Sequence, residues 1–541
     1  MSTVSPLDSA ELRILRDAIQ RRRTFAIISH PDAGKTTLTE KLLLYAGAVE
    51  TAGAVRPKKN RGHATSDWMQ MEQSRGISIT STVLQFEHEG RLLNLLDTPG
   101  HQDFSEDTYR TLTAADSAVM VLDAAKGIEP QTRKLFEVCR LRHIPILTFI
   151  NKMDQPSRDP LELLDEIERI LDIAPCPMNW PVGDGPQFQG VVDFASRRLI
   201  RYSRAGGGQV RASSFELSMD DPSFPAEVGE DRAQHLVDAV ALLEAASAPF
   251  DAERFLAGRQ TPVFFGSALN NFGVDVFLHA LGHLAPGPRP RHGSAGPVDP
   301  ANPEFSAYVF KIQGNMDPSH RDSMAILRIC SGRFERDMLV HHPRLGRKIR
   351  MTRLHRLFAR DRETVDEAFA GDVVGVVNPG VFVIGDTLSS TPDIEYARMP
   401  SFQPEHFGVL RATDISKSKQ FRKGVEQLAD EGVVQVYHAV DGVRREPILG
   451  AVGRLQFDVV ESRLAQEYGV SARVDSLPYV CARWPVATPE QLAGVRWPIS
   501  GFSLVRDRDD RLVGLFASKW ELQLVIRDHP EVLFSETSEP A

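Results

Sequence analysis

The sequence predicts a multidomain protein in which an α/β domain is followed by an antiparallel β-barrel and then by an α+β domain. From Thr24 to about Leu284, apolar runs of strand length alternate with amphipathic segments, a pattern typical of a parallel sheet covered by helices on both faces. After a stretch rich in Pro, Gly and Ala, short alternating strands recur between turns, which is typical of a barrel. Beyond about residue 396, helical and extended patterns mix again and indicate one or two α+β layers.

The predicted domain boundaries lie where the composition of the chain changes. With 541 residues the chain is too long to form one hydrophobic core, so several domains are expected. A short helix between Pro6 and Gln20 precedes the first strand, and an insertion rich in Pro and Gly lies near residues 175–208. The predicted units are residues 1–285 for the first domain with that helix and insertion, 286–303 for a linker, 304–395 for the barrel (domain II) and 396–541 for the α+β domain (domain III).

The bulk composition is that of an ordinary soluble globular protein. Apolar residues make up 42% of the chain and charged residues 25%, and no apolar stretch is long enough to cross a bilayer. The four cysteines are scattered without metal-like spacing, so we expect a reduced, cytoplasmic, monomeric protein without a membrane partner. The net charge of −9 argues against indiscriminate binding to nucleic acid, and DNA is not an expected partner, but a local basic face is compatible with it.

Three consecutive arginines, Arg21, Arg22 and Arg23, follow the predicted first helix. Cations suit a helix C-terminus, and contact with RNA is the alternative interpretation.

The first chemical motif lies between an apolar run, Phe25–Ile28, and residues spaced as in a helix. A strand, a loop of small residues, Gly-Lys-Thr and a helix form the P-loop arrangement that binds phosphate. Backbone N–H groups at the helix start bind anionic oxygens, Lys35 adds a positive charge, and the Thr36 hydroxyl reaches Mg²⁺. The motif is imperfect because Ser29 stands in place of the first glycine of G-x-x-x-x-G-K-[ST]. The predicted phosphate-binding residues are Ser29, His30, Pro31, Asp32, Ala33, Gly34, Lys35, Thr36 and Thr37.

A second motif, Asp97-Thr98-Pro99-Gly100-His101, directly follows another buried run that ends at Leu96. An aspartate at the C-terminal end of such a strand is where a P-loop protein holds Mg²⁺, directly or through water. Gly100 can offer its backbone N–H to a γ-phosphate because it has no side chain to block the approach. Together with the first loop, this motif predicts a nucleotide site.

A third motif, Asn151-Lys152-Met153-Asp154, predicts which base is bound. Guanine presents adjacent N–H donors that one carboxylate can accept, and adenine would leave the buried carboxylate of Asp154 unpaired. Asn151 would face the O6/N7 edge or tie loops together, and the stem of Lys152 can cover the base. The predicted nucleotide is therefore GTP or GDP rather than ATP. The residues predicted to complete the base pocket through backbone N–H groups are Ser267, Ala268 and Leu269.

The segment Arg75–Thr80 lies between the first two motifs and suits a switch loop. A long loop with a hydroxyl residue near its end can be ordered by γ-phosphate and Mg²⁺ and released on hydrolysis; an ordinary surface loop is the alternative. Hydrolysis needs an oriented water, and His101 stands where other GTPases carry a water-orienting glutamine. We therefore predict His101 as the catalytic residue.

Together these residues resemble the translational GTPases over essentially the whole chain. Four segments look most like the bacterial peptide chain release factor 3 family of class II release factors: residues 66–72, 75–80, 97–110 and 452–460. The resemblance implies a GTP-binding domain, a barrel domain II and an α+β domain III. It also implies the ribosomal factor-binding site as partner, with the sarcin–ricin RNA loop activating His101, and a role in using GTP to remove class I release factors after peptide release.

Several residue roles are implied only by this resemblance. Thr36 and Ser78 would coordinate Mg²⁺ beside Asp97, and Asp32 is a candidate ligand for a monovalent cation. Pro31 and Ile77 fall where relatives place an apolar gate beside the histidine. Elongation factors have threonine in place of Ser78, and serine lacks the methyl group that restricts χ1; Thr80 is a second candidate for the same ligand.

Three other interpretations compete with this one. An elongation factor G-like translocase or a ribosomal protection protein would carry further domains beyond the third, and the end of the chain at Ala541 favours the release-factor interpretation. A small-molecule kinase or ATPase is disfavoured by Asn151 and Asp154. A GTP-binding scaffold without turnover is disfavoured by His101.

Overall fold

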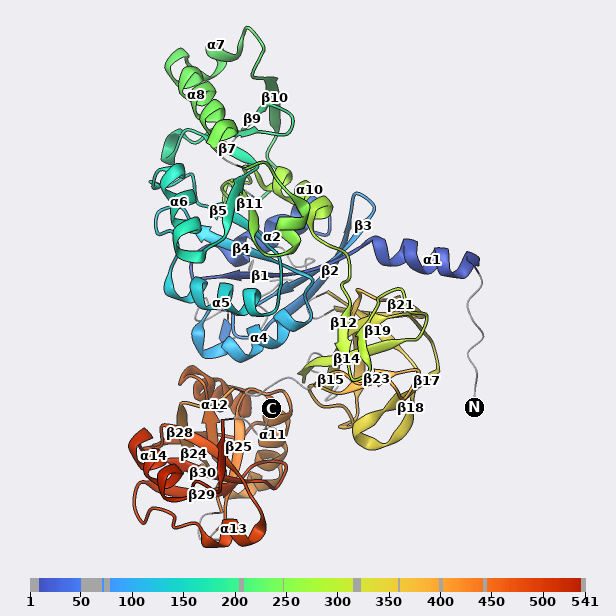
Figure 1. Ribbon diagram of the computed structural model, residues 1–541, viewed down its shortest axis with the longest axis vertical. Coiled ribbons are helices and arrows are strands. Elements are labelled where there is room, and N and C mark those ends of the chain that lie inside the picture. The colour runs from blue at the N-terminus through green and yellow to red at the C-terminus, as the bar shows by residue number, and fades with distance from the viewer. Residues whose placement is uncertain are drawn as a thin grey trace.

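A largely parallel sheet lies at the centre of the first domain (Figure 1). The computed structural model describes residues 9–49, 71–72, 78–203, 209–246, 248–314, 323–358, 361–397, 402–440 and 445–536. The strand order is β2-β3-β1-β4-β5-β11-β6, and β2 runs antiparallel to β3. These strands are β1 (Arg22–Ser29), β2 (Thr82–His88), β3 (Arg91–Asp97), β4 (Ser117–Asp123), β5 (Ile146–Asn151), β6 (Ala174–Pro177) and β11 (Gln260–Phe265).

Helices cover both faces of this sheet because successive strand residues point to opposite faces. Ala26 and Ile28 of β1 belong to a core shared with α4, α5 and α6, whereas Phe25 and Ile27 pack with α2, α9 and α10. The near-continuous apolar runs of the sequence are thus buried on both sides, as predicted. These helices are α2 (Lys35–Ala46), α4 (Ser105–Thr113), α5 (Pro130–Leu141), α6 (Pro160–Leu171), α9 (Ala252–Leu256) and α10 (Val274–Leu284).

A small antiparallel sheet and two helices form the upper end of the first domain in Figure 1. The sheet has the order β10-β9-β8-β7. It is anchored to the main sheet by aromatic packing, because Trp180 of β7 lies edge-on to Phe265 of β11 with ring centroids 5.5 Å apart. The elements are β7 (Asn179–Val182), β8 (Gly190–Asp193), β9 (Arg198–Tyr202), β10 (Ser214–Ser218), α7 (Phe224–Val228) and α8 (Glu230–Ala246).

The barrel is in direct contact with the first domain. Phe358 of β19 pairs with Leu84 of β2, which makes the strands of the two domains one continuous ladder. The N-terminal helix α1 (Ser9–Gln20) packs Leu15 and Ile19 into the core of the barrel. The strands are β12 (Arg291–Gly293) and β13 (Gly296–Val298) as a preceding hairpin, then β14 (Ser306–Gln313), β15 (Ser323–Ser331), β16 (Arg333–Glu335), β17 (Met338–His342), β18 (Arg347–Met351), β19 (Leu354–Phe358), β20 (Asp361–Val365), β21 (Glu367–Phe369), β22 (Val373–Asn378) and β23 (Thr387–Ser389).

The arginine run after α1 caps that helix. Arg22 and Arg23 donate to the carbonyl oxygens of Ala18 and Gln20 in the last turn. This is the role expected of cations at a helix C-terminus, and it supports the first of the two interpretations of this run.

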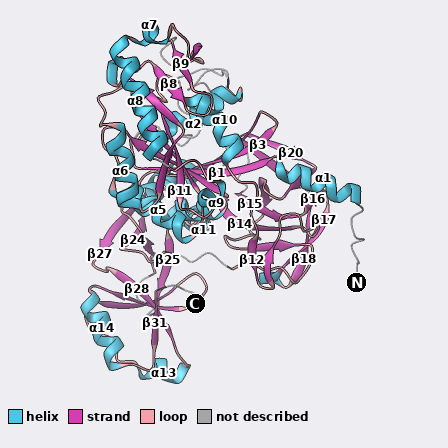
Figure 2. Ribbon diagram, turned by 45° about the horizontal axis from the view of Figure 1, so that its top comes forward, coloured by secondary structure: helices cyan, strands magenta, loops and turns pink. Residues whose placement is uncertain are grey.

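The third domain is a sandwich built from two β-α-β-β-α-β units. Their strands form one sheet in the order β27-β24-β26-β25-β29-β30-β28-β31, in which β25 and β29 join the two units. One face of each half packs against its own helices, and the other faces share a core that includes Tyr437 and Leu515. Figure 2 shows α13 and α14 outside the strands. The elements are β24 (His406–Ala412), α11 (Ser418–Asp430), β25 (Gln435–Ala439), β26 (Ile448–Ala451), α12 (Leu455–Tyr468), β27 (Ala472–Leu477), β28 (Cys481–Val486), α13 (Pro489–Gly494), β29 (Phe502–Arg506), β30 (Leu512–Phe516), α14 (Lys519–Asp528) and β31 (Leu533–Ser535).

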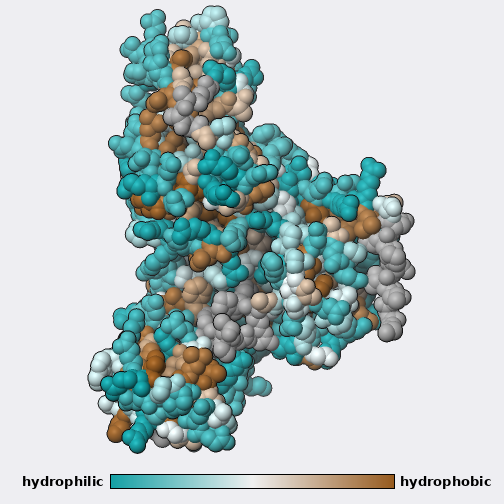
Figure 3. Space-filling view, viewed as in Figure 1, coloured by the Kyte–Doolittle hydropathy of each residue, from teal (hydrophilic) through white to brown (hydrophobic). Residues whose placement is uncertain are grey.

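The surface seen in Figure 3 is mostly hydrophilic, with separate small hydrophobic areas. Exposed apolar residues such as Leu141 and Trp520 lie on different elements, and isolated residues of this kind are normal on soluble proteins. Within the described ranges, no helix combines the length and apolar character needed to span a membrane.

Candidate active site

The loop between β1 and α2 has the backbone geometry of a phosphate-binding loop. Gly34 has a φ of 94°, which favours glycine. A Cβ atom at this position would lie 2.2 Å from Nδ2 of Asn151, so a side chain is excluded on steric grounds as well. Helix α2 begins at the next residue, Lys35, and the first N–H groups of a helix have no intrahelical partner. The loop therefore presents donors to an anion.

Lys35, the first residue of α2, contacts two of the predicted Mg²⁺ ligands, Ser78 and Asp97. Nζ of Lys35 lies 2.6 Å from Oδ1 of Asp97 and 3.4 Å from Oγ of Ser78. Lys35 and Asp97 are both buried, and Thr36 follows Lys35 in the first turn of α2. Two hydroxyl groups and a carboxylate provide the oxygen ligands that Mg²⁺ prefers. The residues present thus fit a magnesium–phosphate site.

Two further hydroxyl groups of the predicted site are buried. Among the described residues, Oγ of Ser29 and Oγ1 of Thr80 have no hydrogen-bond partner. Buried hydroxyl groups normally find one, so both groups have unused hydrogen-bonding capacity. Ser29 ends β1 at the position where the sequence motif lacks its glycine.

The segment after β3 lies against the phosphate loop. Thr98 Oγ1 donates to the carbonyl oxygen of Ile27 in β1 at 2.6 Å. The Cα position of Gly100 faces Pro31, and a Cβ there would meet Pro31 atoms at 3.6 Å, an ordinary contact. Space alone therefore does not require glycine here. The predicted gate partner Ile77 lies outside the described residues, so the gate stays a prediction.

The imidazole ring of His101 interacts with Asp103. Its Nδ1 accepts a hydrogen bond from the backbone N–H of Asp103 at 3.2 Å, which leaves the proton of a neutral ring on Nε2. Oδ1 of Asp103 is 3.1 Å from the same nitrogen, so a protonated ring would donate to that carboxylate instead. The side chain remains 32% exposed. Asp103 can therefore orient the imidazole in both protonation states.

The predicted base-binding residues meet at the ends of β5 and β11. Asn151 donates from Nδ2 to the carbonyl oxygen of Ala33 at 2.9 Å, and its Oδ1 accepts from the N–H of Ala268 at 2.9 Å. Its side chain thus ties the phosphate loop to the segment after β11, the second of the two roles considered for it. The Asp154 carboxylate is half-buried, and within the described part of the chain no residue pairs with it.

Of the backbone N–H groups predicted to bind the base, two already donate hydrogen bonds to described residues of the protein and one does not. The N–H of Ser267 donates to the carbonyl oxygen of Phe272 at 2.9 Å, and that of Ala268 is taken by Asn151. The N–H of Leu269 remains, on a residue that is 54% exposed. Nζ of Lys152 lies 2.8 Å from Oδ2 of Asp123. Burial would raise the pKa of Asp123, but hydrogen bonds from Lys152 and the Ala125 N–H lower it.

Sequence reasoning missed the residues that connect this site to the other domains. Oδ2 of Asp103 accepts from the N–H of Leu455, the first residue of α12, at 2.9 Å. Ile79 and Phe104 share a small apolar cluster with Val459 of α12. The stretch around Leu455 had carried part of the family resemblance, but nothing in the sequence indicated that it contacts His101's neighbour.

Lys311 of the barrel also binds next to the candidate switch. Its Nζ lies 2.7 Å from the carbonyl oxygen of Ser81 and 3.2 Å from Oδ2 of Asp107 in α4. Burial would raise the pKa of Asp107, but Lys311 and hydrogen bonds from Ser81 lower it. The barrel thus fixes the chain just after Ser78–Thr80 and the helix just after His101.

Comparisons with known proteins match three family models in chain order. Residues 20–287 match Elongation factor Tu GTP binding domain, residues 304–391 match Elongation factor G domain 2, and residues 396–526 match Class II release factor RF3, C-terminal domain. This order confirms the predicted fold class.

Curated relatives match over nearly the whole length. Proteins named Peptide chain release factor 3 are 54% identical in Gloeobacter violaceus (96% of this chain, 98% of that protein), 52% in Symbiobacterium thermophilum (97% and 99%) and 52% in Synechocystis (100% and 98%). A crystal structure of a Thermus thermophilus protein has a TM-score of 0.68 at 22% identity and covers 90% of this chain and 72% of that chain; this likeness shows the fold alone.

Proposed function

Because this chain belongs to the peptide chain release factor 3 family of translational GTPases, we propose that it hydrolyses GTP on the ribosome and thereby promotes dissociation of class I release factors after peptide release. One observation carries the proposal. The short segment from Asp97 to Asp103 contacts the phosphate lysine Lys35 at one end and the third-domain helix α12 at the other. A change at the γ-phosphate can therefore reach the third domain through this continuous segment and its hydrogen bond to Leu455.

The phosphate end of the site binds and positions the nucleotide. Lys35 and the N–H groups at the start of α2 bind the β- and γ-phosphates. Thr36, Ser78 and Asp97 hold Mg²⁺, which when bound neutralises charge on the phosphate oxygens. Asp32 is the candidate ligand for a monovalent cation. The backbone N–H of Gly100 contacts the γ-phosphate.

The base end of the site selects guanine. The Asp154 carboxylate accepts the two adjacent N–H groups of guanine, and the N–H of Leu269 completes the pocket. Asn151 acts indirectly, because its amide holds the two loops that form the pocket. Lys152 lies over the base while Asp123 fixes its ammonium group.

Catalysis rests on His101, whose imidazole orients the attacking water in line with the γ-phosphate. The ribosome's sarcin–ricin RNA loop stabilises the active position of the ring. Asp103 is a positioning residue, because it contacts the ring of His101 and α12 and not the nucleotide. Hydrolysis frees the segments around Ser78 and His101, and α12 moves with them.

The protein is proposed to act as a monomer in the cytoplasm, at the ribosomal site where GTPase factors bind. The decisive experiment measures how fast a labelled class I release factor leaves post-release ribosomes when this protein is added with GTP. We expect the dissociation rate to rise above the basal rate. Retention of the class I factor at its basal rate would refute the proposal.

The companion variant is His101→Ala. We expect ribosome-stimulated hydrolysis to fall by about 100- to 1000-fold, as on loss of one transition-state donor, while GTP affinity changes by less than about twofold because His101 contacts no predicted binding residue except through its own loop. His235→Ala, an exposed histidine in α8, is the matched control. Unchanged hydrolysis in His101→Ala would remove this residue from the mechanism.

A further inference from the structure

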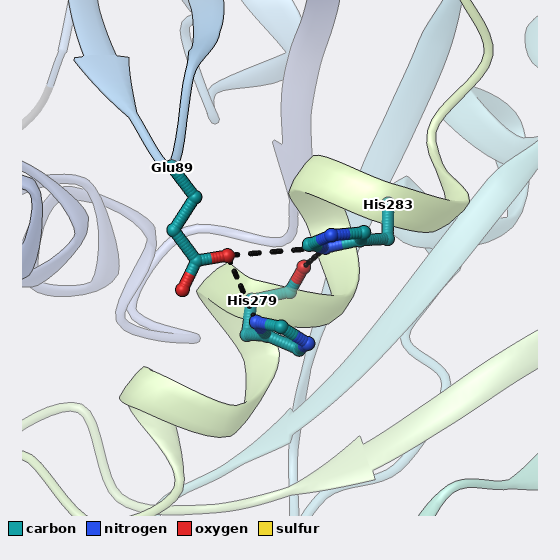
Figure 4. A group of neighbouring side chains, drawn as sticks. All are labelled: Glu89, His279 and His283. Atoms are coloured by element: carbon teal, nitrogen blue, oxygen red, sulfur yellow. Dashed lines mark hydrogen bonds and ion pairs between the residues drawn. The ribbon is translucent and has the colours of Figure 1, made fainter.

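Three side chains with metal-ligand chemistry meet on the outer surface of the first domain, away from the nucleotide loops. Glu89 lies in the turn between β2 and β3, and His279 and His283 lie on α10 (Figure 4). Residues four positions apart on a helix share one face, so both imidazole rings project toward the same turn. Figure 4 shows the Glu89 carboxylate facing both rings.

The distances are close to those needed for a common ion. Oε2 of Glu89 lies 2.9 Å from Nδ1 of His279 and 3.9 Å from Nδ1 of His283. One ligand atom from each of the three residues lies within 4.8 Å of the other two. Ligands on one Zn²⁺ at bonds of about 2.1 Å are roughly 3.4 Å apart. All three side chains are about half exposed or more, so small rotations close the difference.

The ring of His283 also contacts the backbone of its own helix. Nδ1 of His283 lies 2.8 Å from the carbonyl oxygen of His279. A ring that donates there binds an ion through Nε2, so the 3.9 Å from Glu89 to Nδ1 shows how closely the ring approaches and not the metal–ligand geometry. A hydrogen bond of this kind fixes the tautomer of metal-binding histidines. The turn itself is specialised, since Glu89 has a φ of 46°.

We propose that Glu89, His279 and His283 form a site for a divalent transition-metal ion of the Zn²⁺ type. Two imidazoles and one carboxylate are ligands that such ions accept, with water completing the coordination, whereas Mg²⁺ prefers oxygen alone. The site joins the β2–β3 turn to α10. It does not depend on the function proposed above.

Neighbouring groups are compatible with this assignment. His88 has its Nε2 3.8 Å from Oε1 of Glu89. Arg211 is the nearby cation; its Nε donates to the carbonyl oxygen of Leu44 at 3.1 Å and its guanidinium lies over the ring of Tyr45. The four cysteines are buried and do not compete for metal in the folded protein.

A bound ion would act on the elements that carry the phosphate loop. Helix α10 and helix α2, which begins at Lys35, share one apolar core that includes Leu38, Leu42, Phe277 and Leu281. An ion that binds only the folded arrangement stabilises the domain by mass action. We therefore expect Zn²⁺ to raise the unfolding temperature.

The test is a titration of the full-length, tag-free protein with ZnCl₂ at pH 7.5, by calorimetry and by thermal unfolding, without nucleotide. We expect one site per chain, no comparable binding of Mg²⁺, and affinity at least about tenfold weaker in each of Glu89→Gln, His279→Ala and His283→Ala. Glu87→Gln and His235→Ala, both exposed and outside the group, should bind like the unaltered protein.

Two results would contradict the proposed metal site. Zn²⁺ affinity that is the same in Glu89→Gln as in Glu87→Gln would show that the turn takes no part. Equal affinity in the unaltered protein and in His279→Ala would show an ion pair only. Neither result would touch the proposed GTPase, whose test uses His101 and the ribosome.

Discussion

In the proposed nucleotide site, single residues are expected to decide which base is bound, and Asp154 is the clearest case. Its carboxylate is half-buried next to Asn151, which is itself fully used in holding two loops together. Asp154 and Asn151 belong to the same short motif but are expected to have different roles. Asp154 is available for the ligand, whereas Asn151 maintains the pocket.

Asp154→Asn should weaken GTP binding by at least about 100-fold, because about 3 kcal/mol of charge-assisted hydrogen bonding is lost. The new amide can donate to the 2-oxo group of xanthine, so XTP should bind better than GTP. Equilibrium binding of fluorescent GTP and XTP analogues measures both effects. The control is Asp165→Asn, which removes an exposed carboxylate from α6. Tight GTP binding retained in Asp154→Asn would contradict the base-pocket assignment.

At the scale of elements, helix α12 packs on the turn that carries His101, and this contact connects the candidate active site to the third domain. Gly453 immediately precedes this contact, and a Cβ atom there would lie 2.0 Å from Cγ of Asp103. A side chain at 453 must therefore displace the carboxylate that holds both His101 and Leu455. The glycine is needed for close approach rather than for a turn.

Gly453→Ala should leave GTP affinity within about twofold and lower ribosome-stimulated turnover by about tenfold, since the displaced Asp103 no longer positions His101. Steady-state hydrolysis with and without ribosomes measures the two effects separately. Gly494→Ala is the matched control, because a Cβ there meets nothing within 4 Å. Turnover equal in the two variants would show that domain III does not position the histidine.

At the scale of the whole molecule, buried polar groups hold the barrel against the first domain. Arg328 of β15 binds Asp116 at 2.5 Å and also the carbonyl oxygen of Gly371. The side chains of Arg328 and Asp116 are 6% and 7% exposed. Burial raises the pKa of Asp116, and Arg328 opposes that rise without cancelling it. The pair is therefore costly to separate.

Arg328→Met should lower the free energy of unfolding by about 3–5 kcal/mol, because it leaves the Asp116 carboxylate buried and unpaired. Adding Asp116→Asn should recover at least half of the loss. Urea unfolding of the two single variants and the double variant gives the coupling as a double-mutant cycle. Additive losses in the double variant would show that the pair does not hold the domains together.

The family resemblance and the local patterns predicted much of the fold, and they proposed the residues of the site. The buried strands β1, β3, β4, β5 and β11 lie where the apolar runs predicted, because burial on both faces leaves a continuous pattern. Lys35 and Asp97, predicted from motifs, lie together with Ser78, predicted from the family resemblance, and their roles stay predictions. Strand ends in a parallel sheet lie along one edge, so local motifs are brought together by the sheet itself.

Other features depend on contacts between distant parts of the chain. The sequence did not reveal that α1 packs on the barrel, that the third domain repeats one topology twice, or that Phe358 joins two sheets through Leu84. Each involves partners without a shared local pattern. The same holds for Glu89, His279 and His283, whose chemistry is visible in the sequence only as isolated residues.

By itself, the sequence predicted the order of domain types, which the family models confirm, and it predicted the roles of the phosphate, magnesium and guanine motifs. These follow from residue type and from spacings of a few residues, which periodicity and backbone geometry fix locally. The tertiary structure alone decided that Asp103 connects His101 to α12, that Lys311 holds the chain after Ser78, and that a surface group with metal-ligand chemistry exists. These are pairings of side chains far apart in the chain, and they are fixed by how the packed domains and elements meet rather than by the pattern of any one segment.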